Sequence, residues 1–561
     1  MKSVFGIAVS LFVFAAASSA QFAPFDEKSA AEVAVNQSSA KETALKLLEK
    51  SRQLYAAKDV QGAQANYSAA KLMLYLSEAC TEIDKALLAY ILSDAQFCET
   101  LSETLSTDDD LPKVFEILDK LWKDSPENFK KFRNLATAIA VVFDTPPPAS
   151  WPHHQVSEKV LPRKFPDALE TFKTWQEDRS KGRLLFPCEK LSVEEAKFLV
   201  ASVAPQKDKI WARRAVNANI MGIAKIYSSV PYDHGRLNSQ KFDWTGDDYS
   251  LETIKTKGGI CTDQSYFTSE VAKAKGVPAF ILSGAGSDGF HAWVAYMVKS
   301  GKWNFSVGRY EGGNFVTGRT IDPQTWKTST NHELQRMSEG FRRNPKYRLS
   351  EIHSRFAGMF ASDGDSAAAK KAAAEAVKTD PRNFDGWLLL LETTAKSDGD
   401  AGTNAVCANA IKAFAKYPDN DAYFRNILVE NSLKTGKSAD AKKLTNAFIT
   451  KYKTSRPDLC MEFARRELLI DIETDDVKKL KTSYKRLFSI FKNNAAMTLN
   501  GIVIPVLNKL IAEGKTDKVK DVVEQTKLFV KANKDKTLSS NFDSVFAQVD
   551  KILAEINKKK Q

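Results

Sequence analysis

Cys261 is the residue of this sequence whose setting best suits nucleophilic chemistry. It follows Gly258-Gly259-Ile260 and directly precedes a helical pattern over residues 262–275. Because two glycines permit a sharp turn, the thiol is expected in the first turn of that helix. There the unpaired backbone N–H groups and the positive end of the helix dipole favour the thiolate, the nucleophilic form of cysteine. A cysteine alone is more often a small buried apolar residue, so the assignment depends on what accompanies it.

His291 would supply the base that such a thiol needs. It lies thirty residues further on, at the start of an expected strand over residues 290–298 and after a glycine-rich loop, 284–289. Alternation places His291, Trp293, Ala295 and Met297 on one face of that strand. A lone histidine is more often structural, but a histidine at the mouth of a strand can present its imidazole to a thiol on a helix. The pattern predicts a cysteine–histidine pair.

Three motifs in this order resemble the transglutaminase-like domain of the papain-like superfamily. They are Gly-Gly-Ile-Cys261-Thr-Asp263, Gly276-Val-Pro278-Ala and Gly289-Phe-His291-Ala-Trp293-Val. The matching stretch runs over residues 251–303, with looser similarity over 202–332. The resemblance implies that Cys261 is the nucleophile and His291 the general base and then acid, and that a small antiparallel sheet packs against the helix of the cysteine. Members of this superfamily cross-link proteins, hydrolyse peptides or cleave amide-linked glycans, and some have lost catalysis.

The third member of the triad is where this sequence departs from the family. The family pattern has an Asp a few strand residues after the Trp, but Trp303 is followed by Asn304-Phe305-Ser306-Val307-Gly308. Asn304 or Ser306 could accept a hydrogen bond from the imidazole, without supplying a charge. Asp322-Pro323 resembles the missing pair and would serve only if residues 308–318 form an inserted hairpin. Losing a triad acid costs about 10⁴ in kcat in the serine proteases.

The elements around these residues predict an α+β core in a chain that is mostly α overall. Strands are expected over 277–282, 290–298 and 303–307, and the region 227–322 is the clearly mixed one. Residues 41–143 read as helices, and prolines interrupt them over 144–152. Helical pattern resumes over 166–177, 193–202 and 211–224. Asp263 is expected to favour the dipole at the start of its helix rather than to take part in catalysis.

From about residue 365 to the end, the chain is again helical and rich in Lys and Ala. Three segments there superimpose on their prolines, Pro381, Pro418 and Pro457, which lie 37 and 39 residues apart. This spacing is close to the period of about 34 of tetratricopeptide repeats. A tetratricopeptide-like array and an irregular helical bundle are both compatible with the pattern.

The first twenty residues read as a cleaved signal peptide. Lys2 is followed by a largely apolar run over residues 4–17 and then by Ser18, Ser19 and Ala20, a small-residue cleavage site. A membrane anchor needs about 20 apolar residues, and no later stretch is long and apolar enough to span. We therefore expect a secreted, periplasmic or cell-envelope protein. The expected domains are a signal peptide (1–20), a helical domain (21–145), a linker with a helical extension (146–200), the transglutaminase-like domain (201–345) and a helical domain (346–561).

The composition is that of a globular protein. The 561 residues are 43% hydrophobic and 27% charged, with a net charge of +12 at pH 7. Six cysteines are too few for a disulfide scaffold, although Cys80 could pair with Cys98, and Cys407 with Cys460. The cysteines lack metal-ligand spacing, and neither a metal nor another cofactor is implied. Lys and Glu are interspersed without a nucleic-acid motif, so we reject a nucleic-acid partner.

Two functions follow from the sequence. The first is an exported thiol enzyme that acts on amide bonds of a protein or peptide substrate, with Cys261 and His291 as its pair and helical regions that position the substrate. The second is a binding scaffold whose transglutaminase-like core is catalytically impaired and whose helical repeats hold a protein partner. The missing acid near Trp303 motivates the second.

Overall fold

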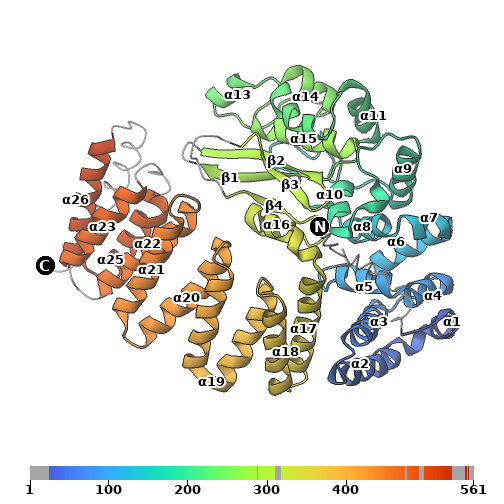
Figure 1. Cartoon of the computed structure of the whole chain (residues 1–561). Helices are drawn as coiled ribbons and strands as arrows, with labels where there is room; N and C mark the ends of the chain where they lie inside the picture. Colours follow the sequence, from blue (N-terminus) through green and yellow to red (C-terminus); the bar gives the residue numbers. More distant parts are fainter. Residues whose placement is uncertain are drawn as a thin grey trace, which may run out of the picture. The chain divides into compact units, whose positions relative to one another are not determined.

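The computed structural model describes residues 24–286, 289–309, 317–473, 477–491, 498–533, 547, 550–551 and 554 (Figure 1). The signal peptide expected over residues 1–20 lies outside this range. The chain is mostly helical with a small five-stranded antiparallel sheet, which confirms the expected α+β class. Within the described residues we find no helix with both the length and the apolar character that a bilayer crossing requires.

Contacts divide the chain into two compact units. The first takes in the chain up to Ile281 together with Val294–Ser300 and Ile321–Thr328. The second consists of Leu282–Trp293, Gly301–Thr320 and the chain from Ser329 onward. The domain boundaries expected from the sequence stay predictions.

The first unit opens with helix α1, which precedes the range expected to be helical, and then with the helices that were expected over residues 41–143. Aspartates cap several of them: Asp59, Asp84, Asp94 and Asp110 each accept a hydrogen bond from a backbone N–H of the first turn. The helices are α1 (Glu27–Val35), α2 (Ala40–Ala56), α3 (Val60–Ala79), α4 (Lys85–Ser93), α5 (Ala95–Thr104), α6 (Leu111–Asp124), α7 (Pro126–Lys131) and α8 (Arg133–Phe143). Residues 144–167 contain no helix, and this segment includes the stretch 144–152, where prolines were expected to break the helical pattern.

Seven further helices of the first unit lead to the cysteine. They are α9 (Ala168–Ser180), α10 (Val193–Val200), α11 (Gln206–Ala215), α12 (Ile223–Ile226), α13 (His234–Asn238), α14 (Leu251–Lys257) and α15 (Cys261–Ala274). Helices α11 and α14 both pack against α15 and so fix the helix that begins at Cys261. The single helix expected over 211–224 is wrong, because α11 ends at Ala215 and the side chain of Asn219 caps a new turn by accepting from Gly222 N–H (2.8 Å).

The sheet contains the three strands that the sequence predicts and two that it does not. Its strands are β1 (Ala279–Gly286), β2 (Gly289–Lys299), β3 (Lys302–Val307), β4 (Arg319–Ile321) and β5 (Thr328–Thr330). Their order is β3-β2-β1-β4-β5, and β1 pairs antiparallel with β4 with Ser283 opposite Arg319. The two additional strands are three residues long, too short for alternation to reveal them.

The second unit continues as a series of helices after α16 (Asn331–Met337). The helices are α17 (Pro345–Ser362), α18 (Ser366–Thr379), α19 (Phe384–Ala413), α20 (Pro418–Lys434), α21 (Ser438–Tyr452), α22 (Pro457–Glu473), α23 (Val477–Phe491), α25 (Ile504–Ala512) and α26 (Thr516–Asn533). From α17 to α23, each helix packs against the next (Figure 1). The helical character expected here is confirmed.

The three prolines that align in the sequence occupy equivalent places in these helices. A non-helical residue, Gly399, divides α19 into two helices. Pro381 then lies between α18 and the first half of α19, whereas Pro418 is the first residue of α20 and Pro457 the first residue of α22. Each proline therefore lies at or just before the start of the second helix of a pair. The assignment of these pairs to the tetratricopeptide class stays a prediction.

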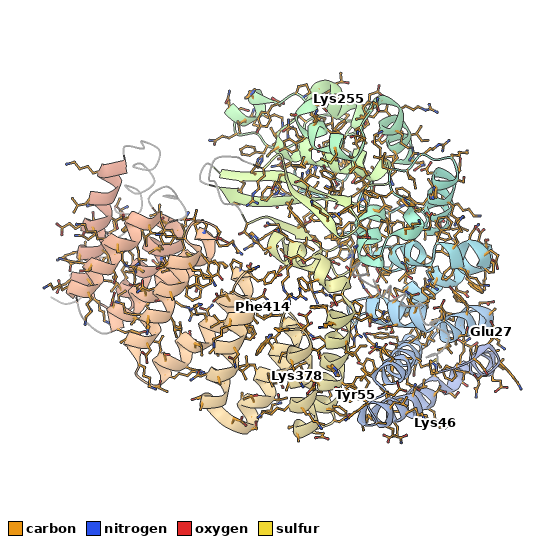
Figure 2. All side chains as sticks on the ribbon, viewed as in Figure 1. Glu27, Lys46, Tyr55, Lys255, Lys378 and Phe414 are labelled. Carbon is orange, nitrogen blue, oxygen red and sulfur yellow. The ribbon has the colours of Figure 1, made fainter. Side chains whose placement is uncertain are left out.

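Both disulfides considered from the sequence are wrong, because none of Cys80, Cys98, Cys407 and Cys460 forms a disulfide. Cys80 is exposed at the end of α3, whereas Cys98 is buried within α5. Cys407 packs in an apolar cluster with Phe414, which Figure 2 labels, and Cys460 in a separate cluster around Phe448 and Tyr484. The buried cysteines thus serve as small apolar side chains of different cores.

Several basic side chains lie on exposed helix faces beside acidic ones. Lys46 and Lys378, both labelled in Figure 2, pair with Glu42 (2.6 Å) and Glu375 (3.1 Å) on their own helices. Such exposed pairs contribute little to stability, because solvent screens them. The positive charge at these places is spread over solvated surfaces.

Candidate active site

Cys261 is the first residue of helix α15, as the sequence predicts. Gly258 turns the chain with a left-handed backbone (φ +84°), and a Cβ there would lie 2.5 Å from the carbonyl oxygen of Pro231. A Cβ on Gly259 would lie 2.4 Å from the Cβ of Asp263. Glycine is therefore required at both positions. The half-buried thiol sits where backbone N–H groups of the first turn stabilise negative charge.

A tyrosine-bearing segment runs beside the cysteine. Gly259 N–H donates to the Pro231 carbonyl (2.9 Å), and its own carbonyl accepts from Asp233 N–H (3.0 Å), so residues 231–233 are fixed against the turn. The pKa of the Tyr232 hydroxyl is raised by burial and then by the charge of the Cys261 thiolate. This places a phenol next to the candidate nucleophile, which the sequence suggests only as part of a polar and aromatic stretch.

Asp263 lies in the first turn of α15, where the sequence expects it to favour the helix dipole. Its fully buried carboxylate accepts from Ile260 N–H (2.8 Å), the Arg236 guanidinium (2.7 Å) and the Tyr249 hydroxyl (2.7 Å). Burial raises the pKa of Asp263, while Arg236 opposes this rise. Because one of these donors is the N–H of Ile260, the residue directly before Cys261, Asp263 helps to position the helix start.

His153 extends this network. Its Nε2 lies 2.9 Å from the Tyr249 hydroxyl, and because that hydroxyl donates to Asp263, the histidine nitrogen is the donor. Burial lowers the pKa of His153 to about 3, so the ring is neutral. His153 is therefore a structural residue of the turn.

His291 lies near the start of β2, again as predicted, and is 7% exposed. Its Nε2 lies 2.5 Å from the carbonyl oxygen of Gly308. A carbonyl can only accept, so Nε2 carries the proton, and a neutral ring keeps its lone pair on Nδ1. The imidazole stacks on Trp293, two residues further along the strand, with ring centroids 6.1 Å apart. The ring orientation is thus fixed by one acceptor and one aromatic face.

Trp293 is itself locked in the sheet. It is fully buried, its Nε1 donates to the carbonyl of Phe305 (2.9 Å), and the Arg309 guanidinium lies 5.4 Å from its ring centroid. Alternation along the strand predicts that His291 and Trp293 share a face, and the stacking of the two rings agrees with it.

The three candidates for the third member have other contacts. Asn304 Oδ1 accepts from Ser306 N–H (2.9 Å), and Ser306 is exposed. Asp322 Oδ1 accepts from the N–H groups of Gln324 (2.9 Å) and Thr325 (3.0 Å), while its Oδ2 lies 3.5 Å from Lys197 Nζ. Asp322 thus caps its own turn and neutralises a lysine. A triad role for any of the three stays a prediction, and residues 310–316 of the expected inserted hairpin lie outside the described residues.

The acceptor that sequence reasoning missed is the main-chain carbonyl of Gly308. No residue type encodes a main-chain acceptor, because every residue has one. The available signal was the glycine itself, which follows β3 with a left-handed backbone (φ +78°). This glycine indicates a turn, but it does not indicate which carbonyl accepts the hydrogen bond from the imidazole.

No group of three or more His, Cys, Asp or Glu side chains gathers to hold a metal ion in the part of the chain that the structure describes.

Comparison with known families agrees with this geometry. Residues 212–305 match the family model of the transglutaminase-like superfamily, a range that includes Cys261, His291 and Asn304 and ends before Ser306 and Asp322. A search among curated proteins found no match. The chain carries a domain of the transglutaminase-like superfamily at residues 212–305, with helical regions before and after it in the sequence.

Proposed function

We propose that this protein is an exported thiol enzyme that cleaves or transfers acyl groups from amide bonds, with Cys261 as nucleophile and His291 as base. The observation that carries this proposal is that one family match spans both residues, with the cysteine at the first turn of a helix. Catalysis requires the two side chains to come within hydrogen-bond reach, about 3 Å.

The first step forms a thioester. Nδ1 of His291 takes the thiol proton, and Cys261 Sγ attacks the carbonyl carbon of the amide. The tetrahedral oxyanion that results is stabilised by N–H groups at the start of α15. The C–N bond then breaks, the imidazolium returns its proton to the leaving amine, and the acyl group stays on sulfur. Water or a second amine takes up the acyl group and regenerates the thiol.

The carbonyl of Gly308 orients the base in this scheme. A triad acid or amide normally holds the imidazole in one tautomer, and here a main-chain acceptor binds Nε2–H and leaves the lone pair on Nδ1. The carbonyl dipole stabilises an imidazolium less than a carboxylate would. We therefore expect a working enzyme that turns over more slowly than one with an acid in this place.

The substrate that we propose is a protein or peptide. Helical regions precede and follow the domain in the chain, and successive helix pairs such as α18–α22 suit extended partners. Export, if the leader directs it, would bring the enzyme to extracellular or envelope proteins.

A second candidate function is a binding scaffold with an inactive core. The neutral character of the Gly308 acceptor favours it, because a carbonyl supplies no charge to the imidazolium. The two candidates differ in the reactivity of one thiol.

The test is the rate at which iodoacetamide alkylates Cys261, followed by mass spectrometry at about pH 6–7. It is measured in a Cys80→Ser background, which removes the exposed cysteine. An enzyme predicts fast alkylation that falls by about tenfold or more in His291→Ala, because the base no longer stabilises the thiolate. His154→Ala, which removes an exposed histidine, is the matched control and is expected to leave the rate unchanged.

Slow alkylation that His291→Ala leaves unaffected would contradict the enzyme and favour the scaffold. For an active thiol, a peptide containing glutamine and a fluorescent amine would then separate the two reactions. Ammonia release without amine incorporation indicates hydrolysis, and incorporation indicates transfer.

A further inference from the structure

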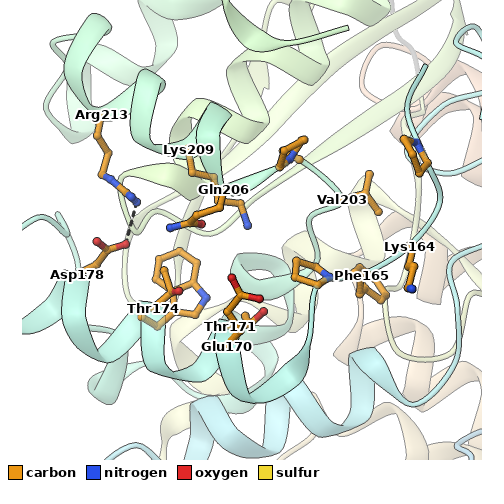
Figure 3. Close-up of a pocket in the computed structure, with 15 residues that line it drawn as sticks. Lys164, Phe165, Glu170, Thr171, Thr174, Asp178, Val203, Gln206, Lys209 and Arg213 are labelled. Carbon is orange, nitrogen blue, oxygen red and sulfur yellow. Dashed lines mark hydrogen bonds and ion pairs between the residues drawn. The ribbon is translucent and has the colours of Figure 1, made fainter. Parts of the chain in front are cut away.

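A pocket of about 320 Å³ lies in the first unit, between helices α9 and α11 (Figure 3). The side chains of Phe165, Trp175 and Val203 and three prolines form its apolar wall. The prolines are Pro162, Pro166 and Pro205. Because proline fixes its backbone, the loops that carry these residues are held in place. Volume and lining are those of a site for a small molecule.

Lys209 is the charged group of this pocket that lacks a partner. It extends from α11 toward α9 and is 7% exposed (Figure 3). In the described part of the chain, its ammonium group makes no hydrogen bond and no ion pair. Buried lysines are rare unless paired, because burial without a partner costs free energy. The unpaired ammonium therefore indicates a site for an anion.

The acidic groups near Lys209 already have cations of their own. Asp178 pairs with Arg213 (2.8 Å) and Arg183 (3.0 Å). On α15, Glu270 pairs with Lys273 (2.9 Å) and accepts from Ser202. Glu177 also lies 3.7 Å from Arg183, so the cluster holds four cations and three carboxylates, and positive charge is in excess.

The remaining lining groups can bind a polar head. Thr171 and Thr174 of α9 and Gln206 of α11 face the pocket and form no side-chain hydrogen bond within the described residues (Figure 3). At the rim, the exposed side chains of Lys164 and Glu170 carry opposite charges, so together they add no net charge to the pocket. Hydroxyl and amide groups can donate hydrogen bonds to a carboxylate, and the unpaired ammonium group beside them can form an ion pair with it.

We propose that this pocket binds a small carboxylate with an apolar body, whose anionic group pairs with Lys209 and whose body packs on Phe165 and Trp175. The site lies apart from the residues proposed for catalysis and does not rest on the proposed function. The pKa of the Lys209 amine also makes the proposal testable by a change of pH. Burial lowers the pKa of Lys209 to about 8, so the amine is charged at neutral pH and loses its charge within an accessible range.

The experiment uses the full chain and a panel of benzoate, hexanoate and 4-phenylbutanoate, each beside its neutral amide. Calorimetry at about pH 7 is expected to show binding of at least one acid that is about tenfold or more tighter than its amide, since a charged hydrogen bond is lost in the amide. Lys209→Met is expected to abolish this preference. Lys207→Met, an exposed lysine on the same helix that does not line the pocket, is the matched control.

A second measurement needs no variant. Acetylation of Lys209 by an N-hydroxysuccinimide ester, read by mass spectrometry, is expected to slow in the presence of the bound acid and not of its amide. Binding is also expected to weaken by about tenfold or more near pH 9.5, where the amine is neutral. Absence of binding at millimolar concentrations, equal binding of acid and amide, or an unprotected Lys209 would each overturn the proposal.

Discussion

At the scale of the residue, Gly258 decides how Cys261 enters its helix. It combines a left-handed backbone with a close approach to the Pro231 carbonyl. We expect Gly258→Ala to lower the melting temperature and to slow alkylation of Cys261, because the added methyl both strains the backbone and displaces residues 231–233. The backbone strain alone costs about 1–2 kcal/mol. Thermal unfolding and the alkylation rate measure the two effects.

Gly364→Ala is the matched control for this change. Its backbone is also left-handed (φ +83°), but no atom lies within 4 Å of the position of its Cβ. It is expected to cost only the backbone strain and to leave Cys261 unaffected. Equal losses of stability in both variants would contradict the steric role of Gly258.

His153 makes the stability of the first unit depend on pH. Folding lowers its pKa from the ordinary 6.5 to about 3, so folding favours the neutral ring. Its contribution is complete above about pH 6.5 and is lost as the pH falls toward 3, at about 1.4 kcal/mol per pH unit. We compare the free energy of unfolding of the wild type with that of His153→Gln at about pH 7 and pH 5. Glutamine keeps a donor for Tyr249 without the titration.

The wild type is expected to lose more stability than the variant between these two values. Other histidines, such as the half-buried His332, whose pKa partial burial lowers to about 4, are common to both proteins and cancel in the difference. Parallel losses would show that His153 is not neutral and buried as described.

Residue types alone predicted where Cys261 and His291 lie, at a helix start and near a strand start, but not the acceptor of the imidazole; the catalytic roles of the two residues stay proposals. Glycines before a helix and a histidine on an alternating strand leave a local signal, which the structure of the two segments agrees with. Asn304, Ser306 and Asp322 were considered because their side chains can accept. The acceptor found on Nε2 is a main-chain carbonyl, which sequence patterns do not distinguish.

At the scale of the element, helix α19 is divided by Gly399, whose backbone (φ +61°, ψ −152°) is one that essentially glycine alone adopts. We expect Gly399→Ala to destabilise the second unit by about 1–3 kcal/mol, because alanine strains the connection between two helices. The change is measured as the shift of the denaturant midpoint.

Gly358→Ala makes the same chemical change, but we expect it to have the opposite effect on stability. Gly358 lies inside helix α17, and no atom lies within 4 Å of the position of its Cβ. Alanine there is expected to stabilise by about 0.5–1 kcal/mol, since glycine loses more conformational freedom in a helix. If both variants lose stability, the division of α19 at Gly399 is not the cause.

Elements with many residues were predicted well, and short ones were not. Helix α15 and strands β1, β2 and β3 agree with the expected ranges within a few residues at each end. Strands β4 and β5 were not predicted, because three residues are too few to show an alternation of apolar and polar side chains. The expected helix 211–224 breaks at Asn219, because its side chain bonds the backbone locally and competes with the helix.

At the scale of the whole molecule, composition predicted what holds the chain together but not where each cysteine goes. Six cysteines in 561 residues imply that apolar cores carry the stability, and the clusters around Phe414 and Phe448 are of this kind. Pairing cannot be read from sequence spacing, since several connectivities fit the same cysteines. The three aligned prolines each lie at or just before the start of a helix, and the choice between a repeat array and an irregular bundle stays a prediction.

The cysteines give a prediction that covers the whole chain. Cys98, Cys188, Cys407 and Cys460 are buried, and burial raises the pKa of each thiol, to about 12 for Cys188 and Cys460 and about 11 for Cys407. Because the thiolate is the reactive form, these four are protected while the chain is folded. Cys80 is exposed and Cys261 half-buried, so the native protein is expected to show two fast thiols.

Unfolding in denaturant without a reductant is then expected to reveal all six thiols to alkylation, each located by mass spectrometry. Dithiothreitol is expected to leave the melting temperature unchanged, because no cross-link restricts the unfolded chain. Four thiols under denaturing conditions would instead indicate a disulfide that forms in the oxidising compartment to which the leader would direct the chain. That result would contradict the absence of disulfides. It would not decide the reactivity of Cys261, which the alkylation rate tests separately, since a cysteine in a disulfide reacts neither in the folded nor in the unfolded protein.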